Sequence, residues 1–331
     1  MTTLFLHGIG HFRPENVIDN AFLEALDIGT TDEWILERVG IRTRRTVLPL
    51  DYIRHTRNRD LRAAHEAALY SNVETGRRAA QLALARAGLR TSDIGLLIAG
   101  GCAADMKIPA EACRIAAAMG IECPAFDLGS ACSSFVAALH VLRQMSELAD
   151  FVLVVNPENT TRVVDYSDRS SAVLWGDGSS AAVVSTRVPS RIAIRHTGFA
   201  SSPEGHGAVR IPDGGHFAQE GSAVQHFAVR TTVSCVAPLV RAHRARPPGS
   251  RRLRFVGHQA NLLMLQAIAR RLELEPEEHW CNVVDYGNTG AAGAPSVLSE
   301  HWDDLRAGDE VLLAAVGSGL SWGSVQMEVT R

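Results

Sequence analysis

The sequence predicts an α/β protein in which helices pack against the faces of sheets. Runs that are apolar without alternation are typical of strands covered on both faces, and four such runs stand out: 94–99, 151–155, 181–185 and 311–316. Segments of helical length lie around them, at 75–87, 110–119, 134–145 and 262–272. The chain has 331 residues, 46% of them hydrophobic, which is enough to bury a large core.

The length suits either two ordinary domains or one fused pair of similar halves. We predict a division near residue 187, which separates an N-terminal half (1–187) from a C-terminal half (188–331). The most linker-like stretch is 201–221, which is rich in Gly, Pro and His. Neither half contains a low-complexity tract or a short-period repeat.

Charge and hydropathy exclude several classes of function. The formal net charge is -3, so no global positive field exists to hold a polyanion, and nucleic acid is not expected as a partner. Residues 1–10 lack a basic segment followed by a long apolar run, and no stretch approaches the ~18 apolar residues of a membrane span. We therefore expect a cytoplasmic protein. His7 and His11 are four residues apart, but Gly8 and Gly10 favour a strand or turn there, so no metal site is predicted.

Residues 42–62 contain seven arginines and two aspartates. A charge run of this kind is usually a solvated, partly helical surface. The alternative is a docking patch for an acidic carrier domain or for cofactor phosphates.

Cys132 is the candidate nucleophile. It lies in Asp127-Leu-Gly-Ser-Ala-Cys-Ser-Ser-Phe135, where small residues precede an apolar helical pattern. This pattern places the thiol at a helix N-terminus, where unpaired backbone N–H groups and the helix dipole lower the pKa of a thiol and can stabilise an oxyanion. A lone cysteine before a buried helix is more often an inert small hydrophobe, so its partners decide the assignment. The remaining cysteines lack such a turn and are predicted to be structural: Cys102, Cys113, Cys123, Cys235 and Cys281.

His258 and Asn288 are the candidate partners of Cys132. His258 follows an apolar strand pattern, and Asn288 lies in a glycine-bracketed turn that enters a helix. We interpret both positions as strand-to-helix junctions. Binding and catalytic residues of α/β proteins lie mostly at the carboxyl ends of strands, so the three side chains could converge there. Taken alone, each residue would be read as hydrogen-bonded scaffolding or a helix cap.

Together, these motifs resemble those of β-ketoacyl-ACP synthase III. The turn at Cys132 is followed in the family's order by Gly257-His-Gln-Ala-Asn261, Gly287-Asn-Thr-Gly-Ala-Ala292 and Gly317-Ser-Gly-Leu-Ser-Trp-Gly323. The resemblance extends to Thr31-Asp-Glu-Trp-Ile-Leu-Glu-Arg-Val-Gly-Ile41 and Asp168-Arg-Ser-Ser-Ala-Val-Leu-Trp-Gly-Asp-Gly178, so it spans nearly the whole chain.

The resemblance implies a thiolase-like fold, in which two similar βαβαβαββ halves form a five-layer αβαβα arrangement. It implies a homodimer that binds no permanent cofactor and uses coenzyme A thioesters or acyl carrier protein. Residues that match Trp34 and Arg169 sandwich the adenine of coenzyme A in the family, with the match to Arg38 beside them. Asn261 is also carried over as a substrate-binding residue.

The resemblance also implies a mechanism in two half-reactions. Cys132 takes an acyl group from a thioester, and a malonyl-type or β-ketoacyl-type thioester then attacks the acyl enzyme. His258 and Asn288 are expected to stabilise the enolate oxygen, and the backbone N–H groups of Cys132 and Gly319 to hold the other oxyanion.

Three departures from the family pattern concern the substrates. Leu263 stands where the housekeeping enzymes carry a basic residue that touches the carrier protein. The region around Ile108, a predicted substrate contact, lacks the pocket aromatic often found there, and 45–76 is longer than in those enzymes. We therefore expect a specialised relative that joins longer acyl chains or feeds a polyketide, resorcinol or pyrone-type product.

Two alternatives keep the resemblance and change the chemistry. Cys132 could pass its acyl group to an alcohol or amine without decarboxylation, which release of carbon dioxide from a malonyl thioester would distinguish. The chain could instead be a non-catalytic subunit of a ketosynthase heterodimer. The presence of all three reactive side chains argues against that second role.

Overall fold

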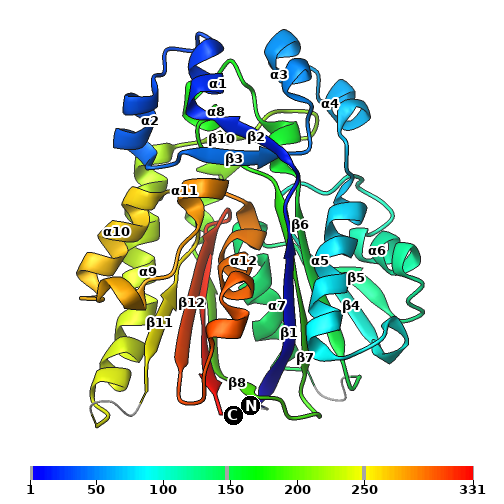
Figure 1. Ribbon diagram of the computed structural model, residues 1–331, viewed down its shortest axis with the longest axis vertical. Helices are drawn as coiled ribbons and strands as arrows, with labels where there is room; N and C mark the ends of the chain where they lie inside the picture. Colours follow the sequence, from blue (N-terminus) through cyan, green and yellow to red (C-terminus); the bar gives the residue numbers. More distant parts are fainter. Residues whose placement is uncertain (1–2, 146–148, 248–250, 331) are drawn as a thin grey trace.

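A computed structural model describes residues 3–145, 149–247 and 251–330. Nine strands form one mixed sheet that runs through the molecule (Figure 1). Across the sheet, the strands are β11 (Leu253–Val256), β12 (Glu310–Gly317), β13 (Ser321–Val329), β8 (Ile192–Ser201), β1 (Leu4–Phe12), β7 (Gly178–Ser185), β6 (Val152–Glu158), β4 (Leu96–Ala99) and β5 (Ala125–Asp127). The four apolar runs therefore form strands β4, β6, β7 and β12, as predicted.

The two ends of the sheet repeat one arrangement. In the N-terminal half, β4 is parallel to β6, and β6, β7 and β1 follow in antiparallel pairs. In the C-terminal half, β11 is parallel to β12, and β12, β13 and β8 follow in antiparallel pairs. An isolated parallel bridge between Phe255 and His279 lies where β5 lies in the other half. The halves meet where β1 pairs with β8 from Leu4–Ile194 to Leu6–Ile192, and the chain crosses between them in the segment from β7 to β8.

Helices cover the sheet in layers, which gives the αβαβα arrangement (Figure 1). Helices α5 (Asn72–Ala87) and α6 (Glu111–Met119) pack on the outer face of the N-terminal strands. Helices α9 (Gly221–Arg244) and α10 (Leu262–Arg271) cover the C-terminal strands. Helices α7 (Ser134–Leu142) and α12 (Gly293–Glu300) lie between the halves and contact strands of both. The predicted thiolase-like fold class is confirmed.

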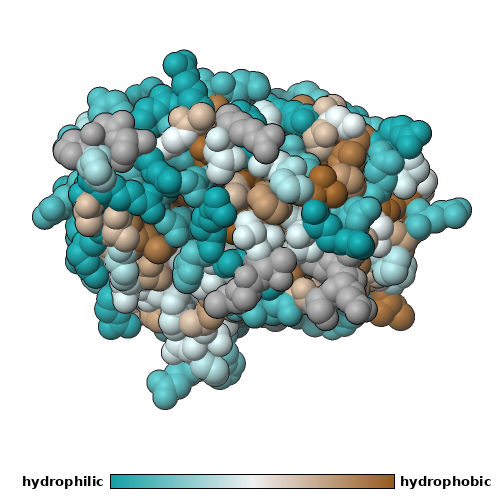
Figure 2. Space-filling model, turned by 90° about the horizontal axis from the view of Figure 1, so that it is seen from below, coloured by the Kyte–Doolittle hydropathy of each residue, from teal (hydrophilic) through white to brown (hydrophobic). Residues whose placement is uncertain are grey.

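A cap of short elements lies at one end of the molecule (Figure 1, top). It comprises β2 (Asn16–Asp19), α1 (Asn20–Ala25), α2 (Asp32–Val39), β3 (Thr43–Thr46), α3 (Leu50–Thr56), α4 (Leu61–Ala67), α8 (Arg169–Ala172), β9 (Val209–Arg210), β10 (Ala218–Gln219) and α11 (Val283–Tyr286). Both termini lie at the opposite end, where hydrophobic side chains form only small separate patches on the described surface (Figure 2). None of the described helices is both long enough and apolar enough to cross a membrane.

Two sequence-based expectations about the cap need correction. Arg44 does not lie on a solvated surface, because it is fully buried and donates hydrogen bonds to the Val173 carbonyl and the Asn20 side chain. The stretch 201–221 is not a simple linker. It contains the β9–β10 hairpin, and it buries Phe217 against Trp175 with their ring centroids 4.7 Å apart. The contact between Phe217 and Trp175 therefore packs this stretch against the cap.

Candidate active site

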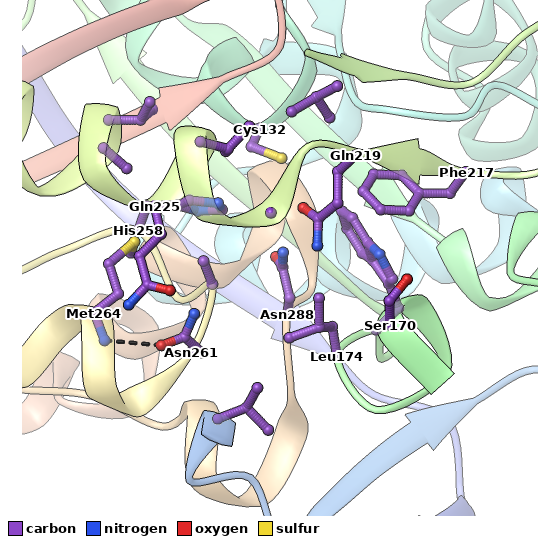
Figure 3. A pocket seen from close by; sticks show the side chains of 18 of the residues that line it. Cys132, Ser170, Leu174, Phe217, Gln219, Gln225, His258, Asn261, Met264 and Asn288 are labelled. Atoms are coloured by element: carbon purple, nitrogen blue, oxygen red, sulfur yellow. Dashed lines mark hydrogen bonds between the residues drawn. The ribbon is translucent and has the colours of Figure 1, made fainter. Parts of the chain in front are cut away.

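One cavity brings together Cys132, His258 and Asn288 (Figure 3). It encloses about 1090 Å³, part of it open to solvent, and it leads inward from the cap. The three side chains are 6 to 9% exposed, so each is buried but reaches the cavity. They come from distant parts of the chain, and only the packing of the two halves places them around one space.

Cys132 lies in the 3₁₀ turn Ala131–Ser133, immediately before α7 begins at Ser134. Cys132 therefore lies just before the N-terminus of the helix, ahead of its first turn. Ala131 adopts the left-handed conformation, with φ 46°, which costs of order 1–3 kcal/mol and is frequent at active sites. Gly317 of β12 packs directly against the turn, which fixes the direction of the Cys132 side chain.

His258 and Asn288 face the same space from different elements (Figure 3). His258 follows β11, as predicted, and its Nδ1 has no hydrogen-bond partner among the described residues. Asn288 does not follow a strand: it comes after the short helix α11 and pairs in an isolated bridge with Trp175. Its Oδ1 accepts a hydrogen bond of 3.0 Å from the Gly290 N–H. This bond leaves the amide Nδ2 as the group that can donate into the cavity.

Cys102 is the main site residue that the sequence reasoning missed. It was predicted to be structural, yet its Sγ lies 3.5 Å from Cys132 Sγ. The hydrogen bond from Cys102 lowers the pKa of Cys132 well below its ordinary value. The His258 imidazole lowers this pKa further, and burial opposes both effects. The hydrogen bond and burial raise the pKa of Cys102, so Cys132 is the thiolate of the pair. The Gly100-Gly101-Cys102 turn after a predicted strand was a signal in the sequence.

Glu158, at the end of β6, lies behind the two thiols and is fully buried. Its carboxylate accepts hydrogen bonds from the backbone N–H groups of Cys102, at 3.0 and 3.1 Å, and of Ala291, at 2.7 Å. Burial, and then the charge on Cys132, raise the pKa of Glu158 to about 7. It therefore gains and loses a proton near neutral pH. The sequence offered no signal for it beyond a single acid at the end of an apolar strand.

A second, smaller cavity of about 450 Å³ adjoins Cys132. Its lining is mostly apolar, and Cys102, Trp175, Ile211 and Phe217 are among its walls. Phe217 belongs to the stretch that resembled a linker. An alkyl group attached to Cys132 Sγ would find apolar walls here, which favours burial of a hydrophobic chain.

At the outer end of the main cavity, the predicted coenzyme A residues lie together. The guanidinium of Arg169 lies 5.0 Å from the ring centroid of Trp34, and that of Arg38 lies 5.5 Å from it. The Thr31 side chain caps α2 at the Trp34 N–H, and Gly40 ends the helix with φ 69°. The short helix therefore presents Trp34 and Arg38 on the side that faces the cavity.

The remaining predicted site residues are placed differently. Asn261 lines the main cavity, where its Oδ1 also caps α10 by accepting from the Met264 N–H at 2.8 Å (Figure 3). Ile108 lines neither cavity of its own chain, and its side chain is 84% exposed. Gly317 and Ser318 line the main cavity, whereas Gly319 is not among its walls. The described residues contain no group of three or more His, Cys, Asp or Glu side chains placed to hold a metal ion.

Comparison with known proteins agrees with this arrangement. Residues 126–202 match the family model of 3-oxoacyl-[acyl-carrier-protein (ACP)] synthase III, and residues 253–329 match the model of its C-terminal part. The β-ketoacyl-[acyl-carrier-protein] synthase III of Helicobacter hepaticus is 34% identical, in an alignment that covers 96% of this chain and 95% of that protein. That of Clostridioides difficile is 32% identical over the same shares of the two chains.

Solved structures give the same answer. The 3-oxoacyl-[acyl-carrier-protein] synthase III of Aquifex aeolicus VF5 superposes with a TM-score of 0.85 at 30% identity and covers 98% of this chain and 99% of that one. The priming β-ketosynthase of the R1128 polyketide biosynthetic pathway superposes with a TM-score of 0.80 at 27% identity, over 99% and 96% of the two chains. This chain therefore belongs to the β-ketoacyl-[acyl-carrier-protein] synthase III family of condensing enzymes.

Proposed function

We propose that this chain loads an acyl group on Cys132 and condenses it with a malonyl-type thioester. The observation that carries the proposal is the single cavity in which the Cys132 thiol meets His258 and Asn288. The thiolate supplies the nucleophile for the first half-reaction, and the imidazole and carboxamide supply two hydrogen-bond donors for the second.

In the first half-reaction, the Cys132 thiolate attacks the thioester carbonyl. A new C–S bond forms, the old one breaks, and the coenzyme A or carrier thiolate leaves. The lowered pKa of Cys132 raises the fraction of the thiol that is present as thiolate, which is the form that attacks. The N–H groups of Cys132 and Gly319 are the proposed donors to the transient oxyanion.

In the second half-reaction, the malonyl-type thioester loses its carboxylate as carbon dioxide. The released electron pair forms an enolate, whose carbon attacks the acyl carbonyl and returns Cys132 to the thiolate. His258 and the Nδ2 of Asn288 are the proposed donors to the enolate oxygen. Both side chains are buried, and donors that are held away from bulk water contribute more to stabilising a developing negative charge.

Trp34, Arg38 and Arg169 are the proposed site for the adenine of coenzyme A, with Asn261 along the arm of the substrate. Three flat groups in a stack need roughly 7 Å between the outer two, since neighbouring carbon atoms lie 3.5–4.0 Å apart. The 5.0 Å between Arg169 and Trp34 is shorter, so Arg169 has to move outward when adenine inserts. Acyl carrier protein is the alternative donor, and with Leu263 in place of the family's basic residue it would have to dock without that positive charge.

The smaller cavity is the proposed site of the acyl chain. Its apolar walls, including Trp175, Ile211 and Phe217, favour a hydrocarbon chain longer than acetyl, of the kind that a specialised relative would join. Kinetics with acetyl-CoA against medium-chain acyl-CoA thioesters test this. A clear preference for acetyl would contradict it.

A homodimer would give Ile108 a role in substrate binding. In its own chain this side chain is exposed and is not among the walls of either cavity, so a contact with substrate would come from a second subunit's cavity. Strand β5 is one edge of the sheet and carries the exposed side chain of Phe126. Pairing of two β5 edges would cover these apolar residues.

Intact-mass spectrometry with acyl-CoA, followed by malonyl thioester, tests the proposed reaction. We expect an acyl adduct on the wild-type protein, its disappearance with release of carbon dioxide on adding the malonyl thioester, and no adduct on Cys132→Ala. Cys235→Ala, in α9, serves as the matched control and should form the adduct. An adduct on Cys132→Ala would overturn the assignment, and turnover without carbon dioxide would favour acyl transfer to an alcohol or amine.

A further inference from the structure

Cys102 and Cys132 form a close thiol pair within the site. Their sulfur atoms are 3.5 Å apart, and both side chains are walls of the smaller cavity. Thiols at this distance touch, and the sulfurs need to approach by about 1.5 Å to reach the S–S bond length of 2.03–2.05 Å. In condensation as proposed above, only one of the two thiols forms a covalent bond, and Cys102 acts there only through its hydrogen bond to Cys132.

We propose that Cys102 and Cys132 are a modification site at which a hydroperoxide produces a reversible disulfide. This inference rests on the proposed assignment of Cys132 as the nucleophile and adds a second reaction of the same atom. The co-substrate is a small hydroperoxide, such as hydrogen peroxide, which can enter through the solvent-open main cavity.

The chemistry balances in two steps. The Cys132 thiolate attacks one peroxide oxygen, an S–O bond forms, the O–O bond breaks, and hydroxide leaves and takes a proton from solvent to become water. Cys102 then attacks the Cys132 sulfur, an S–S bond forms, the S–O bond breaks, and the hydroxyl leaves as a second water with the Cys102 proton. The two cysteines lose two electrons in total, and the peroxide gains them.

The surroundings suit each thiol to its step. Cys132 is the more acidic thiol, and the thiolate is the form that peroxide oxidises. Cys102 is the weaker acid and has to lose its proton before it attacks. The Glu158 carboxylate, which already accepts from the Cys102 N–H, lies beside it and changes its protonation near neutral pH, so it can take that proton.

The disulfide has a clear consequence for the proposed reaction. It would block acylation, because Cys132 would have no free thiolate, and it would also stop further oxidation of Cys132 to the irreversible sulfinic and sulfonic acids. A dithiol reductant would restore both thiols. An acyl group already on Cys132 would prevent the reaction with peroxide, since the sulfur is then a thioester.

The test uses the reduced full-length protein and hydrogen peroxide as the probe. We expect the wild type to lose two hydrogens in intact mass, to give a 102–132 cross-linked peptide without reductant, and to lose condensation activity. Dithiothreitol should restore the activity to its starting level. Cys102→Ser should instead gain two or three oxygens on Cys132 and stay inactive after dithiothreitol. Cys235→Ser, at a partly buried cysteine in α9, is the matched control and should behave as wild type.

Two outcomes would overturn the inference: oxygen addition at Cys132 of the wild type without a 102–132 cross-link, or full recovery of oxidised Cys102→Ser. The cross-link is measured on the wild type, so it does not depend on a variant that folds. An acyl adduct is measured on the same reduced preparation before peroxide is added. Failure to acylate would count against the proposed function, whereas acylation without a disulfide would count against this inference alone.

Discussion

Gly317 lies so close to the Cys132 turn that a Cβ on Gly317 would stand 3.1 Å from the Cys132 backbone nitrogen. The same Cβ would be 2.8 Å from the Ser130 carbonyl oxygen and 2.9 Å from the Ser133 nitrogen. All three neighbours are backbone atoms, so they cannot rotate away. Gly317, the last residue of β12, therefore packs against the backbone of the turn that holds the nucleophile, with no room for a side chain at this position.

Gly317→Ala should displace Cys132 and slow its acylation about 10²-fold, since a shift near 1 Å in a reacting group has that order of effect. Gly207→Ala is the matched control, because a Cβ there meets nothing within 4 Å, and its acylation rate should equal that of the wild type. Single-turnover acylation followed by mass spectrometry measures both rates. Equal rates in the two variants would show that the close packing at Gly317 does not set the position of Cys132.

His258→Ala and Asn288→Ala should each lower the rate of condensation by about 10²–10³, the usual effect of losing one oxyanion donor. Both variants should still form the acyl enzyme. Because the imidazole also lowers the pKa of Cys132, His258→Ala should acylate more slowly than Asn288→Ala at neutral pH and catch up at alkaline pH. Release of carbon dioxide from a malonyl thioester reports condensation. If either variant released carbon dioxide at the wild-type rate, the residue changed in that variant would have no role in condensation.

The pH dependence of Cys132 alkylation should reveal the hydrogen bond from Cys102. A lowered pKa means that the thiolate persists as the pH falls, so wild-type Cys132 should react with iodoacetamide at lower pH than an ordinary thiol does. Cys102→Ala removes the largest cause of the lowering, and the pKa of Cys132 should rise. One hydrogen bond contributes about 1 kcal/mol, so the rate should fall about fivefold at a pH below both pKa values.

At a pH above both pKa values, the two alkylation rates should converge, because Cys132 is then ionised in both proteins. Peptide mapping should assign the label to Cys132 in each protein. Superimposable profiles over the whole pH range would mean that the 3.5 Å contact between the thiols carries no hydrogen bond to the thiolate.

Trp34→Ala should raise the KM for an acyl-CoA about tenfold, because stacking of a base on an aromatic ring contributes about 1–3 kcal/mol. The matched control is a substrate: the same acyl group on N-acetylcysteamine, which has no adenine, should show the same KM with wild type and variant. Steady-state kinetics measure both values. An equal rise with both substrates would indicate damage to the cavity and no adenine site at Trp34.

The local patterns of the chain were sufficient for the secondary structure that holds the site. Apolar runs predicted β4, β6, β7 and β12 because strands covered on both faces need no polar alternation. The small-residue turn at Cys132 and the glycines around Asn288 also have local causes, since each is read from neighbours in the sequence. The resemblance to β-ketoacyl-ACP synthase III motifs supplied the pseudo-duplicated architecture, which residue identity alone does not reveal.

Tertiary structure alone decided which groups meet. Cys102 follows β4 and Cys132 precedes α7, thirty positions later, and they touch because β4 and β5 are parallel neighbours whose carboxyl ends lie side by side. Burial of Arg44 and Phe217, and exposure of Ile108, likewise depend on what packs across them. Sequence patterns report only the neighbours of a residue along the chain. Contacts between distant segments depend on how sheets and helices pack, and this packing determines which reactive groups share the cavity.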